Sequence, residues 1–136
     1  MKKYLREFDK LVSILATLRS KNGCMWDNEQ THESIVKHLF SEAEEVKKAV
    51  KNGDMGNLEE ELGDILLQVV FHAQIAKENK SFSIAGVIEK LNKKLVRRHP
   101  HVFGEYKVKN TKDIEVIWEK VKAEEKTFLK KCKIEK

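Results

Sequence analysis

Apolar residues recur at every third or fourth position along most of this chain, which is the spacing of one face of an α-helix. Prolines and turn dipeptides, which interrupt β-rich folds, are nearly absent, and the chain contains a single proline. The pattern therefore predicts an all-α bundle of about five helices. We expect these helices over approximately residues 5–19, 31–51, 55–77, 84–98 and 112–129, with residue 82 as an alternative start for the fourth.

Polar residues and the proline mark the expected ends of these helices. Thr31 is the expected N-cap of the second helix, and the Asn-Gly-Asp run at residues 52–54 ends it. Pro100 stops the fourth helix, because the residue before a proline is driven away from helical backbone angles. We expect loops at residues 20–27 and 101–110 and a frayed, lysine-rich tail at residues 129–136.

The helix predicted over residues 55–77 carries apolar side chains around its whole circumference. A helix of this kind is usually buried on every side. A domain of five helices can hardly bury one of them completely, so we expect a second copy of the chain to complete the burial. The alternative is a core helix in a monomer. The prediction is a homodimer packed through residues 55–77.

Two pairs of acidic residues stand out on the second and third predicted helices. Glu42 and Glu45 are three positions apart, and so are Glu61 and Asp64, which places each pair on one helix face. The 15 residues between the pairs allow a helix end, a turn and a helix start, so the pairs can face each other. Because four converging carboxylates repel, we expect a hard divalent cation here, Mg²⁺ or its substitute Mn²⁺, of the kind that serves phosphate chemistry.

The fourth predicted helix supplies the opposite charge. Lys94 and Arg98 are four positions apart and share a face, so they can grip a polyphosphate, with the arginine providing a bidentate contact. The alternative is a solvated basic face. We expect His99 and His101 to cap the end of this helix rather than to ligate a metal. For Trp26, in the loop at residues 20–27, we weigh stacking on a base against anchoring of the loop.

Length and composition narrow these expectations. A chain of 136 residues suits one domain, and 40% hydrophobic and 36% charged residues exclude a disordered or membrane protein. No apolar run approaches the roughly 20 residues that span a bilayer, and the first residues lack the apolar segment of a signal peptide. Two distant cysteines, Cys24 and Cys132, exclude a disulfide scaffold and indicate the reducing cytoplasm. The mild net charge of +5 indicates anionic partners.

Several segments together resemble the MazG-type nucleoside triphosphate pyrophosphohydrolases over about residues 5–128. The two acidic pairs match the metal-binding pattern of that family, E-x-x-E followed by E-x-x-D. The tryptophan loop and the RRHPH run make the combination much more specific than the carboxylates alone. The other matching segments are residues 22–32 (NGCMWDNEQTH), 68–73 (QVVFHA), 94–104 (KLVRRHPHVFG) and 118–126 (WEKVKAEEK).

The resemblance implies an all-α domain that spans residues 1–136 and assembles as a homodimer. It implies Mg²⁺-dependent hydrolysis of nucleoside triphosphates to nucleoside monophosphate and pyrophosphate, in nucleotide-pool housecleaning or regulation. Lys94 and Arg98 match positions that contact phosphates, and Trp118 matches one near the nucleotide. The implied metal ligands, which are also the implied catalytic residues, are Glu42, Glu45, Glu61 and Asp64.

Two residues depart from the family pattern. The family often has a glutamate where Ser41 stands and a proline where Met25 stands. The missing acid at Ser41 would weaken a second metal site or remove a candidate base. Glu44 and Glu60 are the alternatives for the group that accepts the proton of the attacking water. Attack on the α- or on the β-phosphorus is equally compatible with this pattern.

Other functions remain open at this stage. One is an all-α pyrophosphatase of narrower specificity, for dUTP, dCTP or phosphoribosyl-ATP, although the RRHPH run favours the MazG type. Another is a module that binds nucleotides or nucleic acid through the basic fourth helix and the tail. Because the tail also contains acidic residues and lacks interleaved aromatic residues, nucleic acid is the less favoured partner.

Overall fold

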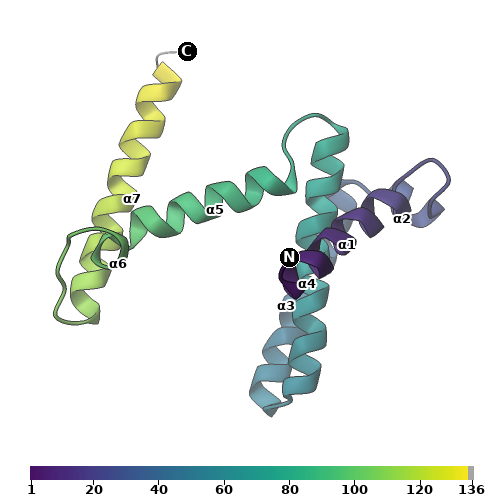
Figure 1. Ribbon diagram of the computed structural model, residues 1–136, viewed down its shortest axis with the longest axis horizontal. Coiled ribbons are helices and arrows are strands. Elements are labelled where there is room, and N and C mark those ends of the chain that lie inside the picture. Colours follow the sequence, from purple (N-terminus) through teal and green to yellow (C-terminus); the bar gives the residue numbers. More distant parts are fainter. Residues whose placement is uncertain (135–136) are drawn as a thin grey trace. The chain divides into compact units, whose positions relative to one another are not determined.

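The computed structural model describes the backbone of residues 1–134 and the side chains of residues 1–130. Within this range the chain forms helices and no strand, so the predicted all-α fold is confirmed (Figure 1). The chain divides into two compact units, residues 1–84 and 85–136. Among the described helices, none combines the length and apolar content that crossing a bilayer requires. The helices are α1 (Lys3–Leu18), α2 (Met25–Glu29), α3 (His32–Asn52), α4 (Met55–Glu78), α5 (Ile84–Arg98), α6 (Pro100–Phe103) and α7 (Thr111–Ile134).

Two short helices, α2 and α6, lie where the sequence predicts loops. A helix of four or five residues has too few apolar positions to show a helical period, so the pattern cannot reveal it. Pro100 stands in the first turn of α6, where its fixed φ angle suits a helix start. The predicted frayed tail is also wrong as far as residue 134, because α7 continues to Ile134. Residues 135 and 136 of that tail lie outside the described residues.

The α3–α4 hairpin has well-defined ends. Thr31 is the N-cap of α3, as predicted: the N–H of Ser34 donates to the Thr31 hydroxyl at 3.1 Å, and the N–H of Thr31 donates to the Ser34 hydroxyl at 2.8 Å. Gly53 ends α3 with a φ of 65°, a left-handed conformation that costs glycine little. Asp54 then caps α4 by accepting from the N–H of Asn57 at 3.1 Å. The chain therefore reverses sharply between α3 and α4 (Figure 1).

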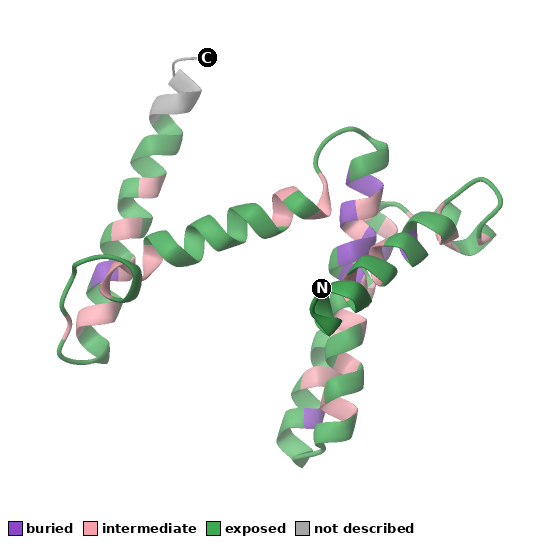
Figure 2. Cartoon of the chain, in the orientation of Figure 1, coloured by how far each residue is buried: buried purple, intermediate pink, exposed green. Residues whose placement is uncertain are grey.

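The core of the first unit lies where α1 and α3 meet the second half of α4, which Figure 2 shows as the main concentration of buried residues. Leu15 comes from α1, Ile35 from α3, and Val70, Phe71 and Ile75 come from α4. Each of these side chains is at most 5% exposed. Burying side chains of this size supplies roughly 1.5–3 kcal/mol each, so this cluster sets how the three helices pack.

The first half of α4 is less covered than its sequence predicts. Leu62, Leu66 and Val69 are 50%, 40% and 38% exposed, whereas the buried residues of α4 all lie between Gln68 and Ala76. Within the first unit, α3 lies along this half of α4 (Figure 1), and one neighbouring helix can cover only one side of another. The expected burial on all sides therefore does not occur within the single chain.

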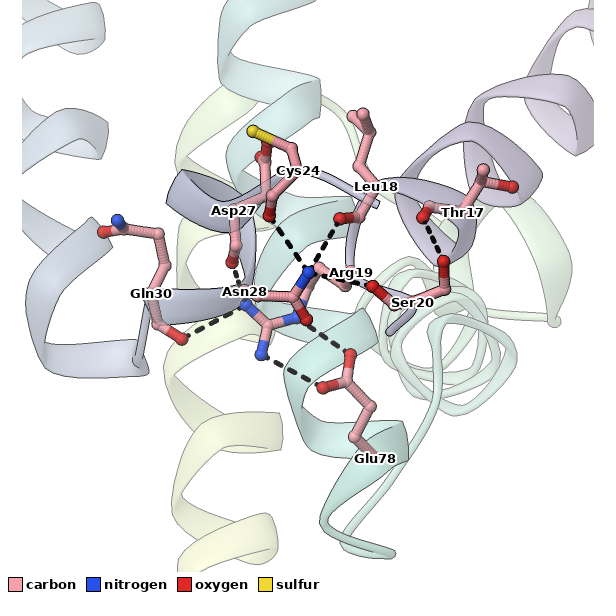
Figure 3. A network of polar contacts seen from close by, with 9 residues as sticks. All are labelled: Thr17, Leu18, Arg19, Ser20, Cys24, Asp27, Asn28, Gln30 and Glu78. Carbon is pink, nitrogen blue, oxygen red and sulfur yellow. Dashed lines mark hydrogen bonds and ion pairs between the residues drawn. The ribbon is translucent and has the colours of Figure 1, made fainter. Parts of the chain in front are cut away.

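Arg19, directly after α1, links three segments of the first unit (Figure 3). Its side chain is only 7% exposed. The Nη1 group donates to the carbonyl oxygens of Asp27 and Gln30, which flank the end of α2. The Nε and Nη2 groups donate to the Glu78 carboxylate at the end of α4, at 2.8 and 3.0 Å. The hydrogen bonds from Arg19 lower the pKa of Glu78, so this carboxylate stays ionised.

The loop that leads into α2 is tightly folded. A Cβ atom on Gly23 would stand 2.3 Å from the carbonyl oxygen of Leu18, so only glycine fits at this close approach. The Asn28 side-chain amide donates to the carbonyl oxygens of Leu18, Ser20 and Cys24 at 3.2, 2.9 and 3.0 Å. These bonds, visible in Figure 3, hold α2 against the end of α1.

The second unit contains nearly all of α5, together with α6 and α7. Among residues 85–130, Ile117 of α7 is the buried apolar residue, at 8% exposure, and Trp118 and Val121 of the same helix are half-buried. Most residues of α5 are exposed (Figure 2). Ion pairs rather than a large apolar cluster therefore connect α5 with α7.

We predict that Arg19→Met lowers the free energy of unfolding by roughly 2–3 kcal/mol, because two carbonyl groups and the Glu78 carboxylate lose their charged donor. The loss is smaller than for a fully buried pair since Glu78 is 36% exposed. Urea unfolding followed by circular dichroism measures it. The control is Lys10→Met, which breaks an exposed pair with Glu7 and leaves stability nearly unchanged. Equal stability of the two variants would contradict the role of Arg19.

Candidate functional site

Three carboxylates converge where α3 faces α4. Glu42 of α3 and Glu61 and Asp64 of α4 each offer an oxygen atom, and these atoms all lie within 4.8 Å of one another. All three residues are half-buried. The hairpin thus brings one carboxylate of the first predicted acidic pair against both carboxylates of the second pair.

Glu45, the fourth acid of the predicted set, lies beside this group. Its side chain is 45% exposed, and its carboxylate accepts a hydrogen bond from Lys48 Nζ at 3.5 Å. Its charge is near enough to raise the pKa of Glu61. The structure therefore clusters three of the four predicted acids and keeps Glu45 within electrostatic range, while their role as ligands stays a prediction.

The proximity of these acids changes the protonation of Glu61. A hydrogen bond with Glu42 raises the pKa of Glu61 to about 7, from an ordinary value of 4.5. Desolvation and the charges of the neighbouring carboxylates act in the same direction. Near neutral pH, Glu61 is therefore still protonated in a large fraction of the molecules.

This donor set fits a hard divalent cation. All of its ligand atoms are carboxylate oxygens, which Mg²⁺ and Mn²⁺ prefer, and the nitrogen or sulfur donors typical of zinc sites are absent from the cluster. A cation also supplies the positive charge that the cluster lacks, and it can replace the proton of Glu61.

An exposed tryptophan lies beside the same face of α3. Trp26 of α2 is 53% exposed, and its ring meets His38 edge-on, with ring centroids 6.1 Å apart. His38 precedes Glu42 by one helical turn, so both lie on one face of α3. The indole is therefore held by α2 near the helix face that carries Glu42, with half of its surface open.

Sequence reasoning missed a histidine pair in the same hairpin. His32 of α3 and His72 of α4 stack with ring centroids 5.0 Å apart, and their Nδ1 atoms are 2.7 Å apart. Burial lowers the pKa of His72, and the charge of His32 lowers it further. One ring must donate and the other accept, so at least one is neutral. No sequence signal reveals the pair, because 40 positions separate its members.

The second unit carries the predicted phosphate-binding residues. Lys94 is exposed on α5 and lines a cavity of about 610 Å³ together with residues of α7. Arg98, at the end of α5, is 28% exposed and donates from Nη2 to the Glu125 carboxylate of α7 at 3.0 Å. Sequence reasoning missed Glu125, and also missed that Arg97 donates to the same carboxylate. A glutamate on another helix offers no spacing signal that could have linked it to these arginines.

Trp118, the residue expected near the nucleotide, is half-buried on α7. Its ring meets His99 edge-on, with centroids 5.7 Å apart, and its indole N–H is buried without a partner among the described atoms. The Nδ1 group of His99 forms a hydrogen bond of 2.6 Å with the carbonyl oxygen of Leu95, which matches its predicted role as a cap. The Nδ1 atom of His101 is buried and likewise unpartnered among the described atoms.

Comparison with known proteins connects these features to a family. The family model for the MazG nucleotide pyrophosphohydrolase domain matches residues 30–103. A nucleoside triphosphate pyrophosphohydrolase/pyrophosphatase MazG of Thermotoga maritima is 52% identical over 129 residues, which cover 93% of this chain and 48% of that protein. A nucleoside triphosphate pyrophosphohydrolase of Escherichia coli K12 is 40% identical over 123 residues, which cover 90% of this chain and 47% of that protein.

The fold agrees with a solved structure. The crystal structure of a mazG-related protein from Thermotoga maritima superposes with a TM-score of 0.70 at 34% identity, covering 85% of this chain and 98% of that one. The chain spans about half the length of the two curated relatives. Because the family model covers more than half of the residues and a solved relative shares the helical fold, this chain belongs to the MazG nucleotide pyrophosphohydrolase family.

Proposed function

We propose that this chain hydrolyses nucleoside triphosphates to nucleoside monophosphate and pyrophosphate in a Mg²⁺-dependent reaction. The observation that carries the proposal is the convergence of Glu42, Glu61 and Asp64 on the α3–α4 hairpin of a MazG family member. The names of the relatives from Thermotoga maritima and Escherichia coli support the same activity. On the two-cysteine composition, the proposed location is the cytoplasm.

In this proposal the carboxylate cluster holds Mg²⁺, with Mn²⁺ as a substitute. Glu42, Glu61 and Asp64 are the ligands, and Glu45 adds a further negative charge beside them. When bound, the ion polarises phosphate oxygens and lowers the pKa of a water molecule. Glu61 must release its proton before its carboxylate can act as a ligand.

The basic residues of the second unit act on the phosphates. Lys94 presents a mobile point charge from the exposed surface of α5, and Arg98 presents a planar guanidinium group that Glu125 holds in place. Both neutralise negative charge that builds up on the departing pyrophosphate. Trp118 supplies a flat apolar surface near the nucleotide, anchored against His99.

The exposed half of α4 supports the proposal of a homodimer. Leu62, Leu66 and Val69 present a row of apolar side chains at helical spacing, and nothing in the described part of the single chain covers their outer side. A second copy of the same helix would bury this row. The enzyme that we propose is therefore a dimer packed through α4.

We predict that Asp64→Asn lowers pyrophosphate release by at least about 100-fold without loss of the fold, because it removes one ligand charge and preserves the size of the side chain. A panel of ribo- and deoxyribonucleoside triphosphates with Mg²⁺, assayed for pyrophosphate and for orthophosphate, measures the effect and the substrate range. The matched control is Asp9→Asn on the exposed face of α1. Unchanged turnover of Asp64→Asn at limiting Mg²⁺ would contradict the assignment.

The raised pKa of Glu61 predicts a pH-dependent stability. The folded state holds the Glu61 proton until about pH 7, whereas the unfolded chain releases it near pH 4.5. This carboxyl therefore favours folding below pH 4.5, and that contribution is lost as the pH rises through 7. Without metal, Tm should fall more between pH 5 and 8 for the wild type than for Glu61→Gln.

The same experiment tests the metal. Adding Mg²⁺ should raise the Tm of the wild type more at pH 8 than at pH 5, because the cation and the proton compete for the same oxygens. Glu61→Gln should gain less from Mg²⁺ at either pH. If Mg²⁺ stabilises both proteins equally at all pH values, the ion binds elsewhere.

We predict that light scattering after size exclusion gives twice the mass of one chain at micromolar concentration. Leu66→Glu should shift the protein toward the monomer, because a charge cannot be buried in an apolar interface without a partner. Val116→Glu, at an apolar position of α7 that is more exposed than Leu66, is the control and should remain a dimer. A monomeric wild type would refute the α4 interface.

A further inference from the structure

Two consecutive arginines at the end of α5 converge on one carboxylate of α7. Arg97 Nε donates to Glu125 Oε1 at 2.6 Å. Arg98 donates to both oxygens of the same group, from Nη2 to Oε2 at 3.0 Å and from Nε to Oε1 at 3.4 Å. The side chains of Glu125 and Arg98 are 19% and 28% exposed and that of Arg97 is 49% exposed, so the carboxylate is the most buried member of the triad.

This convergence is unusual for neighbours in a helix. Consecutive residues point about 100° apart and do not face each other, and two guanidinium groups repel. Arg97 and Arg98 meet only because Glu125 lies between them and bonds to both. The two arginines lower the pKa of Glu125 to about 2, with the bond from Arg98 as the largest cause, so the carboxylate stays ionised at every pH near neutrality.

The triad leaves the outer edges of both guanidinium groups available. Glu125 engages Arg97 through Nε and Arg98 through the Nε and Nη2 edge, and no other described acceptor bonds to Arg97 or to Arg98. Each arginine therefore retains terminal N–H donors for a further anion. The net charge of the triad is +1, and Lys94 on the same helix adds another positive charge.

A cavity lies beside the triad. Its volume is about 610 Å³, and its lining combines two cations, two carboxylates and three apolar side chains: Lys94, Arg97, Glu124, Glu125, Val121, Phe128 and Leu129. This volume falls in the range of small-molecule sites. Arg97 thus faces the same space as Lys94, while Arg98 bonds to the carboxylate in the wall of the cavity.

The geometry points to Glu125 as a positioning residue that fixes Arg97 and Arg98 as a paired clamp for the polyphosphate of the substrate, with Arg97 in direct contact with it. The inference deepens the proposed function and rests on it, since the clamp is assigned to the same nucleoside triphosphate. A clamp of this kind lowers the entropy lost on binding, because the two side chains are already held in place.

Whether the loss of the Glu125 charge weakens or strengthens anion binding distinguishes a positioning role from a purely electrostatic one. Removing the negative charge of Glu125 makes the chain more positive, so electrostatics alone predicts tighter binding of an anion. Positioning predicts weaker binding, because the freed arginines separate and repel. Glu119→Gln is the matched control: it removes one charge from the same helix at a side chain that is 78% exposed and only weakly paired with Lys122.

The test is calorimetric binding of inorganic tripolyphosphate to the full chain in EDTA at constant ionic strength, which keeps the carboxylate cluster free of metal. Glu125→Gln and Arg97→Lys should each weaken binding about fivefold to tenfold. Glu125→Asp, which keeps the charge, should recover part of the loss, and Glu119→Gln should bind as tightly as the wild type or slightly more tightly. Circular dichroism verifies that each variant folds.

Either of two mutational results would overturn the clamp. One is binding by Glu125→Gln that equals or exceeds that of the wild type, and the other is wild-type affinity in Arg97→Lys. A preference for a single-stranded oligonucleotide over tripolyphosphate would also overturn it, because the clamp would then serve a nucleic-acid backbone. The assay is independent of turnover: a wild type that binds tripolyphosphate but releases no pyrophosphate from any nucleotide would refute the proposed function and leave the clamp standing.

Discussion

The apolar cluster that joins α1, α3 and α4 is the interaction on which the first unit depends, because it holds Glu42, Glu61 and Asp64 close together in spite of their mutual repulsion. Carboxylate oxygens within 4.8 Å of one another would separate if their helices were free to move. The capped ends of α3 and α4 and the turn at Gly53 prevent this, and the apolar cluster in the second half of α4 holds the helices together. Apolar burial therefore offsets an electrostatic cost, which the protonation of Glu61 also reduces.

The second unit follows the same logic with the charges reversed. There, two neighbouring cations are held together by one partly buried carboxylate, Glu125. Both groups retain binding capacity within the single chain. The acidic cluster has uncompensated negative charge, and the two arginines have terminal N–H donors that bond to no described acceptor. The carboxylates are suited to a metal ion, which compensates their negative charge, and the arginines are suited to phosphate oxygens, which accept their remaining hydrogen bonds.

Much of the fold was predictable because long helices repeat their apolar positions many times. The five long helices, the Thr31 cap and the turn at residues 52–54 all follow from local spacing. The short helices α2 and α6 do not, because their stability depends on contacts such as those of Asn28 rather than on a period.

The candidate site also has features that follow from local spacing and features that depend on packing. The spacing within each acidic pair is local, whereas the displacement of Glu45 to the edge depends on how the hairpin packs.

The sequence by itself determined the helical class, the two acidic pairs, the basic positions Lys94 and Arg98, and the resemblance that comparison then established as family membership. These features depend on residue types at short, fixed spacings, which a helix converts directly into geometry. Only the tertiary structure decided that Arg19 ties α1, α2 and α4 together, that His32 stacks on His72, and that Glu125 joins Arg97 to Arg98. These contacts link residues that are far apart in the chain, and no local pattern selects a partner for a charge on another helix.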